Sequence, residues 1–399
     1  MRRAPSTCWI SSPTLNRHRS LRIVFSPPHA AALVVPRVPN PDLNDASHWL
    51  CLTLVPGLSP LTLRALLSEF GSPEAVLGAA HAALHKFVPG EVAASIVDGG
   101  NAAGAQAALA WLNEPDNHIV TLGDADYPQL LLQITDPPPL LYVKGRLELL
   151  NRPSLAIVGS RNSSTQGSEN AAEFARALSS AGITIISGLA LGIDAAAHRG
   201  GLAGAGSSVA LVGTGLDIVY PARNKSLAHD LAANGTLVSE FALGTPPLAA
   251  NFPRRNRLIS GMSLGCLVVE AALQSGSLIT ARFANEQGRE VFALPGSIHS
   301  PLAKGCHVLI KQGAKLVDDA NDILDELKLP AGERVARATP ALDPAEASLL
   351  EHLGHAPCEL DALCTRANLG ADMTAGVLLQ LELKGLVESL PGGRYQRVR

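Results

Sequence analysis

The chain has 399 residues, 47% of them hydrophobic, which is enough for about two or three domains with sizeable apolar cores. Its formal net charge is only −3, so the chain is no polycation and any nucleic-acid surface must be a local basic patch. No stretch approaches the run of about 18 apolar residues that a membrane-spanning helix needs. The sequence therefore predicts a cytoplasmic protein with no membrane span.

The six cysteines, at positions 8, 51, 266, 306, 358 and 364, form no CxxC pair. Cys358 and Cys364 have no histidine or cysteine partners at the spacing of a zinc site. In a chain of this size they are expected to be reduced thiols in a reducing compartment. We predict no metal site and no cofactor.

Residues 1–41 contain six arginines, several prolines and no acidic residue. A transit peptide is also rich in arginine and poor in acids, but this stretch is broken by prolines and is not amphipathic. We predict a disordered basic extension that does not contribute to the fold.

Residues 42–115 are predicted to form a small module of short helices. The turn at residues 56–59 separates two apolar segments, 50–55 and 61–70, and residues 71–73 end one helix and begin the next. The pattern is typical of a helix-hairpin-helix-type or SAM-like module. Such turns can contact a DNA backbone or serve only in packing, and the lack of flanking basic residues favours packing.

Residues 116–327 are predicted to form an extended Rossmann-like domain. Two short strands, 119–122 and 140–143, are expected to pack against the edge of its sheet. From residue 154 onward, continuous apolar runs alternate with segments of helical spacing, which is typical of a parallel sheet covered on both faces. The predicted fold class is therefore α/β with a doubly wound parallel sheet. The predicted strands are 155–158, 183–186, 209–212, 237–238, 266–269, 291–293 and 315–317.

The C-terminal part is predicted to consist of a linker at 328–342 and a winged-helix domain at 343–399. Helical patterns cover 345–354, 358–367 and 371–385, and a glycine-rich hairpin follows at 391–393. The domain contains five basic and eight acidic side chains. Since a helix that reads a DNA groove is usually basic, we predict a protein-contact or weak accessory role.

The loops that follow the predicted parallel strands are rich in glycine, serine and threonine. Ligands of open parallel sheets bind at this edge, and glycine loops and helix N-termini accept anions well. The alternative is that glycines serve tight turns only, but several such loops on one rim favour an anion site. The loops are 159–163, 187–194, 213–215, 275–277 and 295–296.

Three arginines within seven residues, 251–257, supply the positive charge that an anion site requires. Arginine can bind phosphate through two parallel hydrogen bonds, and this number of arginines indicates several phosphates in a row. The alternative is a solvated helix face, but no acidic residue is interleaved.

These segments closely resemble the DNA-processing protein A (DprA, or Smf) family. The resemblance lies in GSR (159–161), SGLALGIDAAAH (187–198), GTGLDIVYP (213–221), NFPRRNRLISGMS (251–263), VVEA (268–271), SGSLITA (275–281), VFALPG (291–296) and LIKQGAK (309–315). It covers residues 150–320 densely, and members often carry a helical N-terminal module and a winged helix.

The resemblance implies a single-stranded-DNA-binding protein that acts as a homodimer, protects incoming DNA and loads the recombinase RecA in natural transformation or homologous recombination. It implies no catalytic residues. Phe252 is the candidate for base stacking, with a buried loop anchor as its alternative. The predicted phosphate- and DNA-binding residues are Gly159, Ser160, Arg161, Gly188, Asn251, Phe252, Arg254, Arg255, Asn256, Arg257, Ser275, Gly276, Ser277 and Lys311.

Other polar residues at the rim are given structural roles. Asp194 and Asp217 are expected to cap helices or hold loops, and His198 lacks a nucleophile motif, so we do not assign it a catalytic role. Glu270 is expected to order the basic loop by ion pairing, in preference to acting as a general acid.

The competing hypothesis is a Rossmann-like nucleotide-binding or nucleotide-hydrolysing enzyme. The sequence contains no PGGxGTxxE motif, no P-loop motif GxxxxGK[ST], and no third glycine after Gly213 and Gly215. An enzyme would turn over free nucleotides, whereas a DNA-binding mediator would not.

Overall fold

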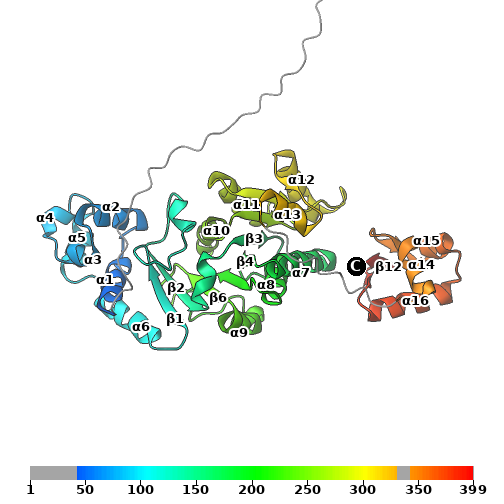
Figure 1. The fold of residues 1–399 in the computed structure, drawn as a ribbon, viewed down its shortest axis with the longest axis horizontal. Coiled ribbons are helices and arrows are strands. Elements are labelled where there is room, and N and C mark those ends of the chain that lie inside the picture. Colours follow the sequence, from blue (N-terminus) through cyan, green and yellow to red (C-terminus); the bar gives the residue numbers. More distant parts are fainter. Residues whose placement is uncertain (1–42, 330–341, 399) are drawn as a thin grey trace, which may run out of the picture. The chain divides into compact units, whose positions relative to one another are not determined.

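The computed structural model describes residues 43–329 and 342–398 (Figure 1). The predicted extension at 1–41 and most of the predicted linker, 330–341, lie outside the described residues. Among the helices of the two described ranges, none is both long and apolar enough to cross a membrane.

The N-terminal module consists of short helices, as predicted. Ser59 and Ser72 cap the starts of two helices: each side chain accepts a backbone hydrogen bond, and each serine is followed by a proline at the first helical position. Gly71 ends the first of these two helices with a φ of +87°. Leu52 and Leu63 are buried in the core of the module. The helices are α1 (Leu43–Thr53), α2 (Pro60–Phe70), α3 (Pro73–Leu77), α4 (His81–Leu84), α5 (Gly90–Val97) and α6 (Ala102–Leu112).

The central sheet has nine strands in the order β1-β2-β6-β5-β4-β3-β7-β8-β9. The pairs from β6 to β9 are parallel, which confirms the predicted fold class. The β1–β2 hairpin does more than pack against the edge, because β2 pairs antiparallel with β6 and extends the sheet. The strands are β1 (Asn117–Thr121), β2 (Leu140–Gly145), β3 (Ser154–Val158), β4 (Thr184–Ser187), β5 (Ser208–Leu211), β6 (Thr236–Ser239), β7 (Gly265–Val268), β8 (Glu290–Ala293) and β9 (Lys315–Leu316).

Helices cover both faces of this sheet. Ile157 of β3 packs into one core with α7 (Thr165–Ser180), whereas its neighbour Val158 packs into another core with α10 (Asn251–Gly261). In Figure 1, α11 lies above the strands and α9 below them. The remaining helices of this part are α8 (Ile193–Leu202), α9 (Lys225–Asn234), α11 (Ser277–Glu286), α12 (Lys304–Lys311), α13 (Ala320–Glu326) and the 3₁₀ turns Leu131–Gln133, Leu147–Asn151, Ala222–Asn224 and Pro301–Ala303.

The strand order reverses between β3 and β7. The chain runs from β3 through β4 and β5 to β6 on one side, and α10 then carries it back to β7 on the other side of β3. The loops after β3 and β7 therefore diverge, and the crevice between them is where open parallel sheets bind ligands.

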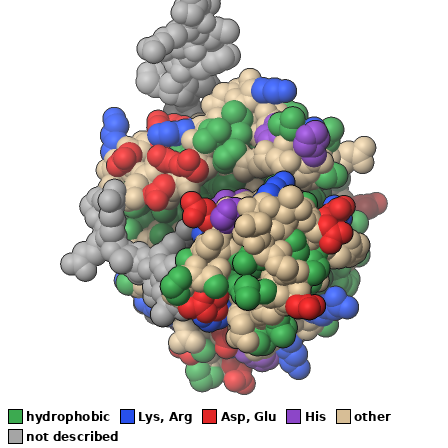
Figure 2. Space-filling model, turned by 90° about the vertical axis from the view of Figure 1, so that its right-hand side faces the viewer, with side chains coloured by type: hydrophobic (Ala, Val, Ile, Leu, Met, Phe, Trp, Pro, Cys, Tyr) green, Lys and Arg blue, Asp and Glu red, His purple; other side chains and the backbone are tan. Residues whose placement is uncertain are grey.

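The C-terminal part is a winged helix, as predicted. Its three-stranded sheet has the order β10-β12-β11. The third helix exposes Met373 and Leu383, and Figure 2 shows hydrophobic, acidic and basic side chains intermixed over the face that it views. The predicted protein-contact role stays a prediction. The elements are α14 (Pro344–Leu353), β10 (Cys358–Glu359), α15 (Leu360–Ala367), α16 (Ala371–Leu383), β11 (Val387–Leu390) and β12 (Arg394–Arg397).

Candidate nucleic-acid interface

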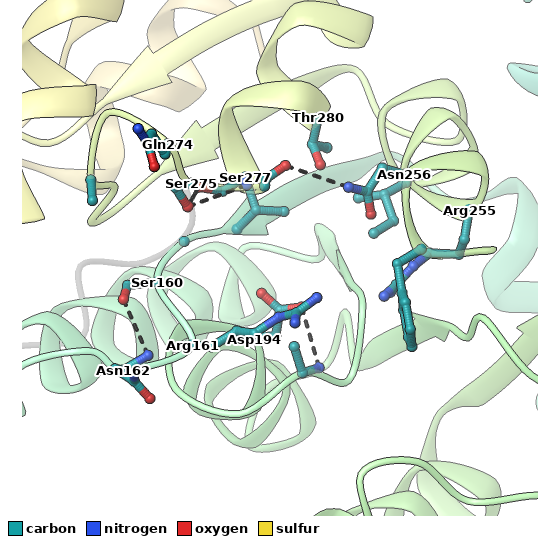
Figure 3. A pocket seen from close by; sticks show the side chains of 17 residues that line it. Ser160, Arg161, Asn162, Asp194, Arg255, Asn256, Gln274, Ser275, Ser277 and Thr280 are labelled. Atoms are coloured by element: carbon teal, nitrogen blue, oxygen red, sulfur yellow. Dashed lines mark hydrogen bonds between the residues drawn. The ribbon is translucent and has the colours of Figure 1, made fainter. Parts of the chain in front are cut away.

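A cavity of about 490 Å³ lies at the point where the strand order reverses. Its walls come from the loops after β3, β4 and β7 and from α10, which are far apart in sequence. Figure 3 shows the loop with Ser160 and Arg161 on one side and Ser275 and Ser277 on the other. The predicted binding residues that line it are Gly159, Ser160, Arg161, Phe252, Arg255, Asn256, Ser275, Gly276 and Ser277.

The loop after β3 is fixed by close contacts with α8 and with the loop after β7. A Cβ atom on Gly159 would lie 2.6 Å from Ile193 Cγ1, so only glycine fits there. The amide of Ser160 donates to the Glu270 carbonyl oxygen at 2.8 Å, and the carbonyl of Ser160 accepts from the Ile193 amide. These contacts leave the Arg161 side chain exposed at the mouth of the cavity.

The opposite wall is the N-terminus of α11. Gly276 occupies the N-cap position and provides no side-chain oxygen to cap the helix, and the first turn carries no acidic residue. Ser275 Oγ and Ser277 Oγ lie 2.7 Å apart beside it. The positive end of the helix dipole and two hydroxyl groups thus face the same cavity as Arg161, an arrangement that favours a phosphate.

Arg255 forms part of the cavity as a buried charge. Its side chain is only 4% exposed, and its Nη1 donates to the Leu211 carbonyl oxygen at 2.7 Å. Burial lowers the pKa of Arg255 to about 10, while the nearby Asp194 carboxylate acts in the opposite direction. Arg255 is therefore a buried, fixed positive group of the cavity lining, and its predicted contact with DNA stays a prediction.

The predicted role of Gly188 needs correction. A Cβ atom at this position would lie 1.9 Å from Arg255 Nη1. The Gly188 amide donates to Asp194 Oδ2 at 3.1 Å, so this donor is already occupied. Gly188 makes room for Arg255 and does not form a phosphate cradle. Asp194, which also accepts from the Ala190 amide, holds this loop as predicted.

The other two arginines of α10 point away from this cavity. Arg257 is 8% exposed, and its Nη2 lies 2.6 Å from Glu240 Oε2, while Arg254 Nη2 lies 3.3 Å from the same oxygen. Successive residues of an α-helix are rotated by about 100°, so Arg255 faces a different direction from Arg254, whereas Arg254 and Arg257, three residues apart, share a face. The predicted binding arginines are therefore divided: Arg255 lines this cavity, whereas Arg254 and Arg257 pair with Glu240, a partner that was not predicted.

Asn251 and Lys311 also lie outside the lining of the cavity. Asn251 is buried and its Nδ2 donates to the Gly213 carbonyl oxygen at 3.1 Å, which anchors the start of α10 to the loop after β5. Lys311 is exposed at the end of α12. Asn251 is therefore a structural anchor, and a DNA contact by Lys311 stays a prediction.

Phe252 lines the cavity and lies among aromatic and cationic side chains. The Arg161 guanidinium lies 5.6 Å from the Phe252 ring centroid, and the Tyr220 and Phe252 ring centroids are also 5.6 Å apart. Tyr220 is 45% exposed and was not among the predicted site residues. The feature that could have indicated it is its position as an aromatic residue in one of the rim loops.

Glu270 has a different partner from the one expected. Its carboxylate accepts from the Ser164 amide at 3.0 Å and from Ser164 Oγ at 2.6 Å, at the start of α7. The expectation that it pairs with the basic loop is therefore corrected. Asp217 accepts from the Gly244 amide at 2.9 Å and holds a loop, as predicted.

His198 is a buried structural residue. Its Nε2 accepts from the Leu189 amide at 3.2 Å, which leaves the proton on Nδ1, and Nδ1 lies 2.8 Å from Ser208 Oγ. Burial, and secondarily Arg255, lower the pKa of His198 to about 3.

Because the unfolded chain takes up this proton near pH 6.5 and the folded chain only near pH 3, stability should fall as the pH drops through that window. The slope from this group is up to about 1.4 kcal/mol per pH unit. An NMR titration of the ring should show no protonation of His198 at pH 5. A midpoint near 6.5 would contradict the arrangement.

Within the described residues, no group of three or more histidine, cysteine, aspartate or glutamate side chains could hold a metal ion. The groups in the cavity that can interact with an anion are the arginines, the serine hydroxyls and the N-terminus of α11, and one aromatic ring lies beside them.

A doubly wound parallel sheet with a cavity at its switch point, followed by a winged helix, defines a Rossmann-like protein with an appended winged helix. The sequence model described as DNA recombination-mediator protein A matches residues 118–328, and the DprA winged helix domain matches residues 333–393. The chain belongs to the DNA processing protein A (DprA/Smf) family.

Individual relatives agree with this assignment. Protein Smf of Escherichia coli (strain K12) is 46% identical over 305 residues, covering 74% of this chain and 81% of that protein. The DNA processing protein DprA of Streptococcus pneumoniae (strain ATCC BAA-255 / R6) is 46% identical over 205 residues, covering 51% and 72%. The X-ray structure of DprA from Streptococcus pneumoniae has a TM-score of 0.63 at 34% identity and covers 72% of this chain and 99% of that one.

Proposed function

We propose that this protein binds the backbone of single-stranded DNA in the cavity between β3 and β7. The observation that carries the proposal is the meeting of Arg161, the N-terminus of α11 and the Phe252 ring around one cavity of about 490 Å³. The guanidinium and the helix N-terminus would hold phosphate, and the aromatic side chains would stack on a base. A base–aromatic contact contributes about 1–3 kcal/mol.

A single strand suits this arrangement better than a duplex. In a duplex the bases are stacked inside the helix and their faces are not available to Phe252 or Tyr220. In a single strand they are available, and stacking is tolerant of sequence because every base has a flat face. The protein would therefore bind strands with little sequence preference.

We propose further that the protein is not an enzyme. Asp194 is the carboxylate that lines the cavity, and its Oδ2 is occupied by the amides of Gly188 and Ala190. His198 is neutral and fully buried. Both groups are thus committed to holding the loop, which supports binding without a chemical step over the alternative of nucleotide hydrolysis.

In the cell, we propose that the protein works in the cytoplasm as a homodimer, protects incoming single strands and loads RecA onto them during natural transformation or homologous recombination. The support is membership of a family described as recombination mediators.

A competition experiment tests the proposed function. A fluorescent single strand of about 30 nucleotides is bound by the full chain, and unlabelled single strand, duplex of the same sequence and free nucleotides compete for it. We expect the single strand to compete best and nucleotides to remain unchanged on incubation. Preference for the duplex would contradict the binding proposal, and turnover of free nucleotides would favour the enzyme.

A further inference from the structure

A second cavity, of about 450 Å³, lies at the carboxyl end of β6. It is lined by residues 57–60 of the turn between α1 and α2, residues 138–140 before and within β2, residues 240–242 after β6, and the side chains of Tyr142 and Arg254. Neither the phosphate loops nor the rest of the proposed DNA site explains this cavity.

The two cavities open on the same rim of the sheet. Tyr142 of β2 pairs with Ser239, the last residue of β6, so the second cavity lies beyond the same strand ends as the first. They also share α10, because Arg255 lines the first cavity and its neighbour Arg254 lines the second. The diameter of an α-helix with its side chains is about 10–12 Å, a distance that a few nucleotides can span.

Arg254 retains hydrogen-bond donors for a ligand. Its side chain is 46% exposed, and only Nη2 is paired, with Glu240 Oε2 at 3.3 Å. Its other guanidinium nitrogens have no partner among residues 43–329 and 342–398. The guanidinium lies 5.4 Å from the Phe241 ring centroid, which fixes its position at the edge of the cavity. A phosphate between the two cavities would find free donors here.

Tyr142 and Glu240 are polar side chains of the second cavity. Tyr142 is 2% exposed, and among the described residues the lining side-chain atom that is buried without a hydrogen-bond partner is Glu240 Oε1. A buried acceptor without a partner is costly, so a base N–H group that donates to it would be favourable. The lining also includes the apolar side chains of Pro138, Pro139 and Phe241, which suit the flat face of a base.

We propose that the second cavity is a further nucleotide subsite for the same DNA strand, with a base against Tyr142 and its phosphate on Arg254. The proposal rests on the proposed single-strand binding at the first cavity. In this proposal the turn between α1 and α2 forms one wall of the DNA path, whereas the sequence favoured a role in packing only.

A length series separates the two cavities. Affinities for oligothymidylates of about 3 to 20 nucleotides are measured for the wild type and Arg254→Gln. The matched control is Arg146→Gln, since Arg146 is 38% exposed in a comparable ion pair with Glu148, at the other end of β2. We expect Arg254→Gln to bind long strands about tenfold more weakly, the loss of one charged hydrogen bond, and short strands normally.

Photo-cross-linking gives an independent readout. Oligonucleotides with one 5-iodouracil at successive positions should cross-link to Phe252 or Tyr220 at one position, and to Tyr142 or Phe241 a few nucleotides away. Cross-links confined to the first cavity, with Arg254→Gln equal to the Arg146→Gln control at every length, would overturn the second subsite and leave the proposed function standing. Equal weakening at all lengths would also overturn it. Failure of the wild type to bind any strand would instead overturn the proposed function.

Discussion

Replacing Arg255 with alanine is expected to lower the free energy of unfolding by about 2–5 kcal/mol, because it empties a buried site and removes a positive charge that acts on the buried Asp194. Arg255 is 4% exposed and Asp194 is 7% exposed. The Arg255 guanidinium also hydrogen-bonds the Leu211 carbonyl oxygen, which would lose this partner. Chemical denaturation, followed by circular dichroism, measures the loss.

The matched control for this variant is Arg254→Ala on the adjacent position of α10. Arg254 is half-exposed, and exposed ion pairs contribute about 0–1 kcal/mol, so its removal should change stability little. Equal stability of the two variants would contradict the structural role of the buried Arg255. The large effect expected at Arg255 also means that weaker DNA binding by Arg255→Ala cannot be read as the loss of a DNA contact alone.

Replacing Gly192 with alanine is expected to displace the loop that carries Arg161. Gly192 has a φ of +75°, and a Cβ atom there would lie 2.3 Å from the Ser160 carbonyl oxygen and 2.7 Å from that of Arg161. Left-handed strain alone costs of order 1–3 kcal/mol, and the backbone clash adds to it. We expect the affinity for single-stranded DNA to fall at least about tenfold, because the displaced loop would lose a phosphate contact. Fluorescence anisotropy measures this affinity.

Gly182→Ala provides the control for the backbone strain. Gly182 has a φ of +88°, but a Cβ atom there would meet nothing within 4 Å. This variant should lose stability through the same left-handed strain and keep its DNA affinity. If both variants lost affinity equally, the packing of Gly192 beneath Ser160 and Arg161 would not be what positions the loop.

The sequence predicted the fold class well because its signals are local and repeated. Continuous apolar strands such as 155–158 and 266–269 were recognised by composition alone, and both lie within one residue of the observed β3 and β7. The antiparallel pairing of β2 with β6 was not predicted in detail, because register between distant strands depends on contacts that no local pattern records.

The candidate site was predicted in outline and corrected in its arginines. The loops at 159–161 and 275–277 meet across the cavity because strand ends of a parallel sheet share a rim, which topology implies. The different positions and partners of Arg254, Arg255 and Arg257 could not be predicted. They depend on the rotation of the helix and on residues distant in sequence, Asp194 and Glu240. Gly188 was taken for a phosphate loop because a glycine that makes room for a side chain looks the same in sequence.

The most direct test of the account is the salt dependence of single-strand binding by the wild type, Arg161→Gln and the control Arg146→Gln. For single strands, the slope of log K against log salt concentration is about −0.7 for each phosphate neutralised. The account predicts that Arg161→Gln binds more weakly with a slope shallower by about 0.7, while Arg146→Gln keeps the wild-type slope. An unchanged slope in Arg161→Gln, or binding that does not respond to salt, would contradict a DNA backbone in the cavity between β3 and β7.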